Sequence, residues 1–496
     1  MKNGLPTTWT AARLDDTCHI EMGQSPPSTT YNQEENGLPF FQGKAEFTDL
    51  YPVVRKWCSK PSKLARKDDI LLSVRAPVGP TNLAHSECCI GRGLAALSPQ
   101  PGVSNRYILH AIRRFEADLA KLGSGSTFEA ISGQDVREFT IPIAPSSEQI
   151  RIVAKLEELF SDLDAGVAAL DRARANLKRY RAAVLKAAVE GKLTEQWRKD
   201  HPDVEPGSKL LERILAERRK EWEEAQLAKY AAAGKRSSTG WTSTYPVPRT
   251  IDHSSLPELP AGWCWSSLGQ CFKVAVGATP SRKVSEYWNG DIPWVSSGEV
   301  QFCKIYQTRE RITPAGLKNS STQINPAGSV LLGMIGEGKT RGQAAILEID
   351  ACNNQNCAAI WVSETPIPVR FVYYWLYSRY ELTRAIGSGN NQPALNKTLV
   401  EDIPIPLPPT EEQVEIVNQL DERLSAVEFA TAGIEKGLTR ALRLRQAILK
   451  RAFEGKLVPQ DTNDEPASVL LERIRAARAA SAPPTRNGRG KRIRAA

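Results

Sequence analysis

An internal duplication is the feature that most restricts how this chain can fold. The segment LPTTWTAARL, from Leu5, returns 254 positions later as LPAGWCWSSL. The segment GSGSTFEAIS, from Gly123, corresponds to GSGNNQPALN 264 positions later, and EGKLTEQ, from Glu190, returns as EGKLVPQ at the same distance. A repeat found at this length indicates two related halves, each large enough to form its own core.

The similarity between the two halves is uneven along the chain. LLERI at Leu210 recurs unchanged at Leu470, whereas the globular parts share framework positions such as Gly23 and Gly277. Each half therefore reads as a globular module of about 140 residues followed by a long helix. We expect an α+β protein with a pseudo-two-fold internal repeat and different module tips. A duplication that had drifted without a function would leave the same pattern.

Each long helix begins with the same signal. Ser146 and Gln149 stand three residues apart behind a proline, and Thr410 and Gln413 repeat that arrangement. This spacing predicts a capping box, in which the two side chains bond the free N–H groups of the first helical turn.

Both helices are also predicted to end in the same way. Gly191 and Gly455 follow the last periodic residues, where glycine can adopt the left-handed conformation that ends a helix. A helix over residues 150–190 would be roughly 60 Å long at 1.5 Å per residue.

Apolar residues recur along both helices with a period close to 3.5 residues, which is typical of a left-handed coiled coil. Because the two sets match in length and register, we expect the helices to pair with each other in antiparallel fashion, with a module at each end. Packing of each helix on its own module or on another protein is the alternative. The residues expected in the contact are Leu156, Phe160, Leu163, Val167, Leu170, Leu420, Leu424, Val427, Ile434 and Leu438.

Composition narrows the class of partner. The formal charge of +9 and the pI near 9.0 favour a polyanion. No run of 18 apolar residues and no secretory signal is apparent, and the nine cysteines include no C-x-x-C pair. A reducing cytoplasm is therefore expected, with neither a disulfide framework nor a metal site.

Signatures of catalysis are weak. GMIGEGKT, from Gly333 to Thr340, fits the phosphate-loop pattern, but the following RGQAAILEID reads as a strand where a helix is needed. The E-x-K triplets at Glu190 and Glu454 coincide with the helix ends, and no adenine-methyltransferase tetrad is present. We expect a protein that is not itself an enzyme. The alternatives are an NTPase that uses GMIGEGKT and a coiled-coil adaptor that touches no DNA.

The combination of motifs resembles the specificity (S) subunits of type I restriction–modification systems. It comprises two different modules, each followed by IPIAPSSEQ or IPLPPTEEQ and by a long helix that ends in EGKL, with GDIPWVSSGEV from Gly290 and GSGSTFEAIS from Gly123. The resemblance implies two target recognition domains that read the halves of an asymmetric bipartite DNA sequence with a fixed spacer. It also implies docking of two methyltransferase (M) subunits and of restriction (R) subunits, which would bind S-adenosylmethionine, ATP and Mg²⁺ in place of this chain.

The expected organisation follows the repeat. It is a first target recognition domain at 1–145, a long and a short helix at 146–233, a linker at 234–258, a second target recognition domain at 259–409, a second pair of helices at 410–480, and a basic disordered tail at 481–496.

Candidate DNA contacts are side chains on polar, glycine-bearing loops. Lysine and arginine suit phosphates and guanine, and amides suit adenine. For each candidate an ordinary solvated loop residue is the alternative, and Arg92 could equally support a core strand. The segment CNNQNCAAI, which aligns with the region of Arg92, carries amides, so the modules are expected to differ there in base choice. The candidates are Lys44, Arg75, Arg92, Ser124, Thr127, Ser297, Glu299, Lys339, Arg341, Asn390, Asn391 and Gln392.

Overall fold

The computed structural model describes residues 4–123, 130–234, 240–336, 338–386 and 394–481. The chain divides into two compact units, and unit 1 combines residues from the two ends of the sequence. Unit 1 comprises residues 1–172 and 434–496, and unit 2 comprises residues 173–433. The predicted tail lies, from residue 482 onward, outside the described residues.

The globular part of unit 1 contains three sheets packed with short helices. In the four-stranded sheet every neighbouring pair is antiparallel, and its buried strands are rich in Leu, Ile and Ala. The sheets are β1(Thr10–Arg13)-β11(Thr140–Ile143), then β2(Cys18–Met22)-β10(Leu94–Pro99)-β7(Ile70–Ser73)-β8(Thr81–Leu83), then β3(Tyr31–Asn32)-β5(Trp57–Cys58)-β4(Leu38–Phe41)-β9(Cys88–Ile90)-β6(Leu64–Ala65). The helices are α1(Leu14–Thr17), α2(Asn105–Arg114), α3(Glu116–Ala120) and α4(Gly133–Glu138).

The globular part of unit 2 repeats the strand order of the four-stranded sheet and adds a fifth strand at its edge, whereas its other larger sheet has three strands in place of five. The sheets are β12(Cys264–Ser267)-β21(Pro404–Leu407), then β13(Lys273–Val276)-β20(Cys357–Trp361)-β17(Val330–Gly333)-β18(Ala344–Leu347)-β15(Cys303–Ile305), then β16(Glu310–Ile312)-β14(Trp288–Val295)-β19(Cys352–Asn353). The helices are α8(Leu268–Cys271), α9(Pro314–Lys318), α10(Val369–Ser378), α11(Tyr380–Ala385) and α12(Lys397–Glu401). The parallel pair β4–β9 corresponds to β14–β19, which confirms the predicted α+β repeat.

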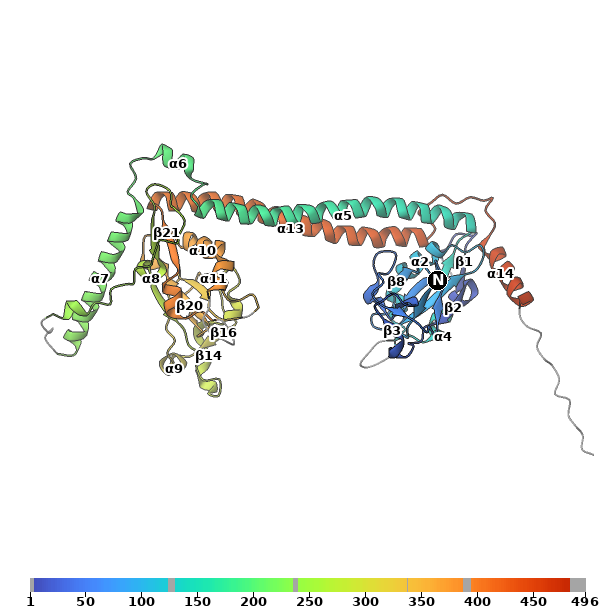
Figure 1. Ribbon diagram of the computed structural model, residues 1–496, viewed down its shortest axis with the longest axis horizontal. Coiled ribbons are helices and arrows are strands. Elements are labelled where there is room, and N and C mark those ends of the chain that lie inside the picture. The colour runs from blue at the N-terminus through green and yellow to red at the C-terminus, as the bar shows by residue number, and fades with distance from the viewer. Residues whose placement is uncertain (1–3, 124–129, 235–239, 337, 387–393, 482–496) are drawn as a thin grey trace, which may run out of the picture. The chain divides into compact units, whose positions relative to one another are not determined.

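The two long helices are α5(Ser146–Val189) and α13(Thr410–Phe453), of 44 residues each. In unit 1 Arg445 of α13 pairs with Asp164 of α5, and in unit 2 Arg181 of α5 lies 3.2 Å from Glu428 of α13. Partners therefore move backward along α13 as α5 advances, so the helices are antiparallel, as predicted; Figure 1 shows them side by side. All ten predicted contact residues are buried or half-buried.

The long helices begin at the predicted residues, but the prediction of a capping box is wrong. Ser146 directs its hydroxyl to the carbonyl of Gly102 at 2.7 Å. The Gln149 amide donates to the Ala144 carbonyl at 2.8 Å and accepts from the N–H of Ser104 at 2.9 Å. Gln149 therefore joins the start of the helix to its own globular module. The local pattern could not predict these bonds, because their partners come from the tertiary fold.

The predicted helix ends are confirmed. Gly191 and Gly455 have φ of +68° and +71°. The N–H of Lys192 donates to the Ala187 carbonyl at 2.8 Å, and the N–H of Lys456 donates to the Arg451 carbonyl at 2.9 Å. These bonds satisfy carbonyl groups that the last helical turn would otherwise leave free.

Short helices follow each long helix: α6(Glu195–Asp200), α7(Gly207–Ala232) and α14(Ala467–Ser481). Leu210 and Ile214 of α7 enter the core of unit 2, whereas Leu470 and Ile474 of α14 enter the core of unit 1. Part of the segment predicted as a linker forms the turn η3(Trp241–Thr244), which packs on α7. Among the described residues, no helix has both the length and the apolar character needed to cross a membrane.

Candidate nucleic-acid interface

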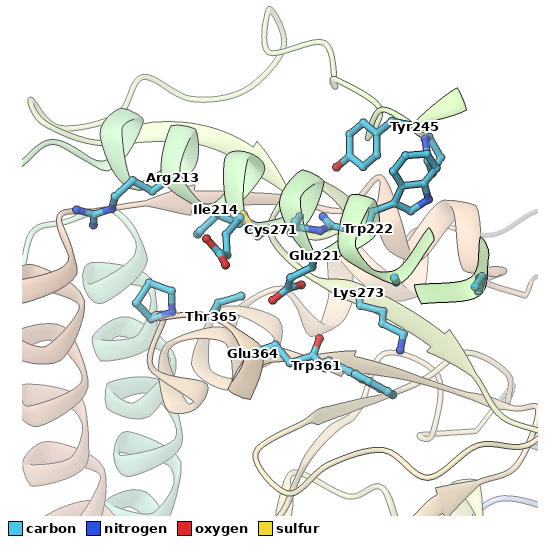
Figure 2. Close-up of a pocket in the computed structure, with 16 residues that line it drawn as sticks. Arg213, Ile214, Glu221, Trp222, Tyr245, Cys271, Lys273, Trp361, Glu364 and Thr365 are labelled. Atoms are coloured by element: carbon cyan, nitrogen blue, oxygen red, sulfur yellow. The ribbon is translucent and has the colours of Figure 1, made fainter. Parts of the chain in front are cut away.

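A cavity of about 640 Å³ contains none of the predicted site residues. It lies in unit 2, between α7 and the edge of the sheet at β13 (Figure 2). Two of its cations are engaged: Lys273 lies 3.3 Å over the ring of Trp361, and Arg218 donates to the Gln270 carbonyl at 2.6 Å. Glu221 and Glu364 face each other there, and burial raises the pKa of Glu364. This mixed lining does not match a polyanion.

Three predicted cations of unit 1 stand on loops that converge. Lys44, Arg75 and Arg92 are all exposed. The N–H of Val74 donates to the Gly93 carbonyl at 2.9 Å, which joins the loop of Arg75 to that of Arg92. The N–H of Gly91 donates to the Phe41 carbonyl at 2.8 Å, which joins the loop of Arg92 to that of Lys44. The fold therefore brings together the loops that carry these three residues.

The turn that carries Arg92 is tightly packed on both sides. A Cβ atom on Gly91 would lie 3.1 Å from the Cα of Gln42, and one on Gly93 would overlap the Gln42 carbonyl. Glycine is needed at both positions because the backbones approach so closely. The N–H of Arg92 donates to the hydroxyl of Ser25 at 3.3 Å. Its side chain is therefore the one that the turn presents to solvent.

Unit 2 builds the corresponding turn from Asn354, Gln355 and Asn356. The N–H of Asn354 donates to the Val295 carbonyl at 3.0 Å, and the Asn356 carbonyl accepts from the N–H of Met334 at 2.8 Å. Gln355 is exposed at the centre of the turn. Sequence reasoning marked this segment but did not name Gln355, because the distance between matching positions changes along each module and hides the pairing.

The remaining described candidates of unit 2 differ in accessibility. The carboxylate of Glu299 accepts from the N–H groups of Ser296 and Arg309, each at 3.0 Å, so both oxygens are used within the module. Ser297 is half-buried, and its hydroxyl lies 3.4 Å from the amide of Asn354. Lys339 is exposed, whereas Arg341 is only 9% exposed.

Five candidates lie outside the described residues: Ser124, Thr127, Asn390, Asn391 and Gln392. The residues next to these segments are described. Ala130 forms an isolated bridge with Arg75, and the N–H of Leu395 donates to the Met334 carbonyl at 3.0 Å. Ala130 and Leu395 therefore lie beside loops that carry other candidates.

Sequence reasoning missed a basic arm in unit 2, formed by β14, β16 and the residues before them. Arg282 stacks 3.9 Å from the Trp288 ring centre and pairs with Glu310 at 2.9 Å. Arg309 and Arg311 are exposed on the same arm. The stacked tryptophan and the arginines of QTRERI were the available signal, but they are far apart in the sequence.

The GMIGEGKT segment joins two strands. It runs from the end of β17 to the turn before β18, and these strands pair in antiparallel fashion with Leu331 opposite Ala345. The helix N-terminus that a phosphate loop needs is therefore replaced by a second strand, as predicted. Within the described ranges, no group of three or more His, Cys, Asp or Glu residues could hold a metal ion.

Comparison with known proteins gives a consistent result. The family model for the type I restriction modification DNA specificity domain matches residues 6–169 and 260–440. The EcoDI specificity subunit of Escherichia coli is 23% identical over 96% of this chain and 97% of its own. The MjaX putative specificity subunit of Methanocaldococcus jannaschii is 40% identical over 158 residues, which are 31% of this chain and 37% of that protein. A solved chain from a type I R-M system, described in terms of complex assembly and conformational transition, has a TM-score of 0.65 at 19% identity and covers 91% of this chain and 99% of its own.

Proposed function

Since the chain belongs to the family of type I restriction modification DNA specificity domains, we propose that it is the non-catalytic DNA-reading subunit of a type I restriction–modification complex. The observation that carries the proposal is the repeated module. Two copies of one fold present different side chains at matching exposed turns, Arg92 in one and Gln355 in the other. Two unlike readers suit a target with two unlike halves.

The long helices supply the fixed spacer in this proposal. Each has 44 residues, which corresponds to roughly 66 Å at 1.5 Å per residue. Ten base pairs span about 34 Å of duplex, so helices of this length can set the interval between two half-sites. Adding seven residues to both helices, at matching levels, should lengthen the permitted spacer by about three base pairs. An unchanged spacer in a variant that remains active would contradict this role.

Partner subunits supply the chemistry in this proposal. Ile150 and Val414, at matching positions near the two helix starts, are 67% and 47% exposed, which suits helix faces that two methyltransferase subunits would cover. Those subunits would bind S-adenosylmethionine, and the restriction subunits would bind ATP and Mg²⁺. The complex would act in the cytoplasm, on host and incoming double-stranded DNA.

The testing experiment is long-read methylation mapping of host DNA with the gene present and deleted. We expect a split, asymmetric motif with a fixed spacer to lose its methylation on deletion. Replacing residues 5–140 by the module of a relative should then change one half of the motif only. A coiled-coil adaptor that reads no DNA predicts no change on module exchange, and the absence of any motif that depends on the gene would refute the proposal.

A further inference from the structure

The two modules place different side chains at one matched position. Three backbone hydrogen bonds establish the match. In unit 1 the N–H groups of Gly91, Val74 and Gln24 donate to the carbonyls of Phe41, Gly93 and Ile90, respectively. In unit 2 the matching N–H groups of Asn354, Met334 and Ala278 donate to the carbonyls of Val295, Asn356 and Asn353. All six N···O distances lie between 2.8 and 3.1 Å. The residue at the centre of the turn is Arg92 in unit 1 and Gln355 in unit 2.

The surroundings of the position are also matched. A hydroxyl contacts the central residue of each turn: Ser25 accepts from the backbone N–H of Arg92 at 3.3 Å, and Thr279 donates to the side-chain Oε1 of Gln355 at 2.6 Å. Ser25 and Thr279 stand 254 positions apart, the distance that relates the first parts of the two halves. The flanking Gly91, Gly93 and Asn354 are buried, whereas both central side chains are exposed. Each turn therefore holds out one polar side chain from a rigid base.

The two side chains have different preferences for base edges. A guanidinium donates two hydrogen bonds to O6 and N7 of guanine, and a carboxamide bonds N6 and N7 of adenine. Arg92 forms no ion pair with the described residues, so its fork of donors is available. An amide oxygen has two lone pairs and its nitrogen has two N–H groups. Gln355 can therefore keep its bond to Thr279 and still bond an adenine.

We propose that Arg92 and Gln355 are matched base-reading residues, with Arg92 bonding a guanine in one half-site and Gln355 bonding an adenine in the other. This inference rests on the proposed function and adds to it the identity of one base in each half-site. Ser25 positions Arg92 through its backbone N–H, and Thr279 positions Gln355 through its side-chain oxygen.

The experiment uses the full chain co-expressed with its methyltransferase subunits in a host without other adenine or cytosine methylation. Motifs are mapped for the wild type, Arg92→Gln and Gln355→Arg. We expect Arg92→Gln to change one G·C position of one half-site to A·T or to relax it, with the other half-site unchanged, and Gln355→Arg to do the reverse. Lys121→Gln, which removes the same charge from an exposed, ion-paired residue of unit 1, should leave the motif intact.

A binding measurement covers variants whose methylation is too weak to map. Binding of the purified complex to the wild-type motif is compared with binding to duplexes that carry 7-deazaguanine at each guanine in turn. Loss of N7 at one guanine removes one of the two hydrogen bonds and should weaken the wild type by less than the about 5- to 150-fold that corresponds to a whole bidentate pair. The same duplex should bind Arg92→Gln with no further loss. A thermal melt confirms that each variant is folded.

The outcomes distinguish the base-reading role of Arg92 from the proposed function of the chain. The base-reading role would be overturned if the Arg92→Gln variant methylated the same motif as the wild type, or if the variant bound every duplex more weakly by the same factor. Either result would leave the proposed function standing. The latter result would make Arg92 a phosphate contact, because such contacts carry no sequence information. A wild-type chain on which no methylated motif depends would instead refute the proposed function.

Discussion

At the scale of single residues, each unit buries one carboxylate at the start of a long helix and bonds it to a tryptophan. Trp9 donates to Glu148 and Trp263 donates to Glu412, both at 2.8 Å. The other carboxylate oxygen has a different partner in each unit. Glu412 also receives Arg198, whereas Glu148 receives the neutral amide of Gln460. Burial raises the pKa of Glu148, and the bonds from Trp9 and Gln460 oppose that rise.

A buried glutamine shows how one substitution breaks the repeat. Ser104 supplies an N–H to Gln149 in unit 1. The matching residue in unit 2 is Pro368, which precedes α10 as Ser104 precedes α2. Proline has no N–H, and the Oε1 of Gln413 is buried without a hydrogen-bond partner among the described residues. Unit 2 therefore carries a cost, of about 1–3 kcal/mol, for an unsatisfied acceptor that unit 1 avoids.

His110 predicts a pH dependence of unit 1. It is 5% exposed against the ring of Phe160, and burial, aided by Arg113, lowers its pKa to about 3. Below pH 6.5 the unfolded chain binds a proton that the folded unit does not, so stability falls as the pH drops from 6.5 toward 3. The loss by pH 5 should be about 2 kcal/mol. Urea unfolding at pH 7 and pH 5 measures it, and His110→Leu should remove this part of the difference. An equal pH dependence in the variant would contradict the assignment.

At the scale of elements, the glycines of the long helices have opposite roles. Gly455 and Gly191 end the helices at positive φ, and a Cβ atom there would meet Pro6 and Pro260, respectively. Gly166 and Gly433 lie inside the helices, and a Cβ atom on either would meet nothing within 4 Å. The same residue type is therefore required at the ends and only tolerated inside.

These environments predict opposite effects for one substitution. Gly455→Ala should destabilise the protein by more than about 1 kcal/mol, because alanine is strained at positive φ and Pro6 leaves no room for its Cβ atom. Gly433→Ala should stabilise it by about 0.5–1 kcal/mol, because alanine favours a helix interior. Thermal unfolding of the full-length variants compares them directly. Changes in stability of the same sign in both variants would contradict the different roles of the two glycines.

At the scale of the whole molecule, each globular module is completed by a helix from elsewhere in the chain. The N–H of Ala467 in α14 donates to the Thr8 carbonyl at 2.9 Å, and the N–H of Gly207 in α7 donates to the Gly262 carbonyl at 2.8 Å. These bonds occupy matching places in the two units. The first module therefore depends on residues near the end of the sequence, and the second depends on residues that precede it.

Truncation should reveal this dependence. Removal of residues 467–496 deletes Leu470, Leu471 and Ile474 from the core of unit 1, at a cost of more than about 4 kcal/mol. That is a large share of a domain's stability, so hydrogen exchange should become fast in the strands of unit 1 and stay slow in those of unit 2. A chain cut after residue 481 serves as the control. Unchanged protection of β2 and β10 in the chain without residues 467–496 would contradict the dependence of unit 1 on α14.

Comparison of the two halves of the sequence was enough to determine the repeat, and local patterns were enough to determine the long helices and their glycine ends. The period of Leu156, Phe160 and Leu163 and the conformational freedom of Gly191 act over a few neighbouring residues. They need no knowledge of the rest of the fold. The sequence also selected Lys44, Arg75 and Arg92, because residue type and loop composition are local properties as well.

Tertiary structure alone decided which residues meet. Gln149 bonds Ser104 because β11 and α2 lie beside the helix start, and the capping pattern could not anticipate that neighbour. The carboxylate of Glu299 accepts a hydrogen bond from the backbone N–H of Arg309, although its residue type and loop suited a base contact. Gln355 matches Arg92 through backbone hydrogen bonds between distant strands. Such pairings depend on how loops of different lengths close, and that information is spread over the whole module.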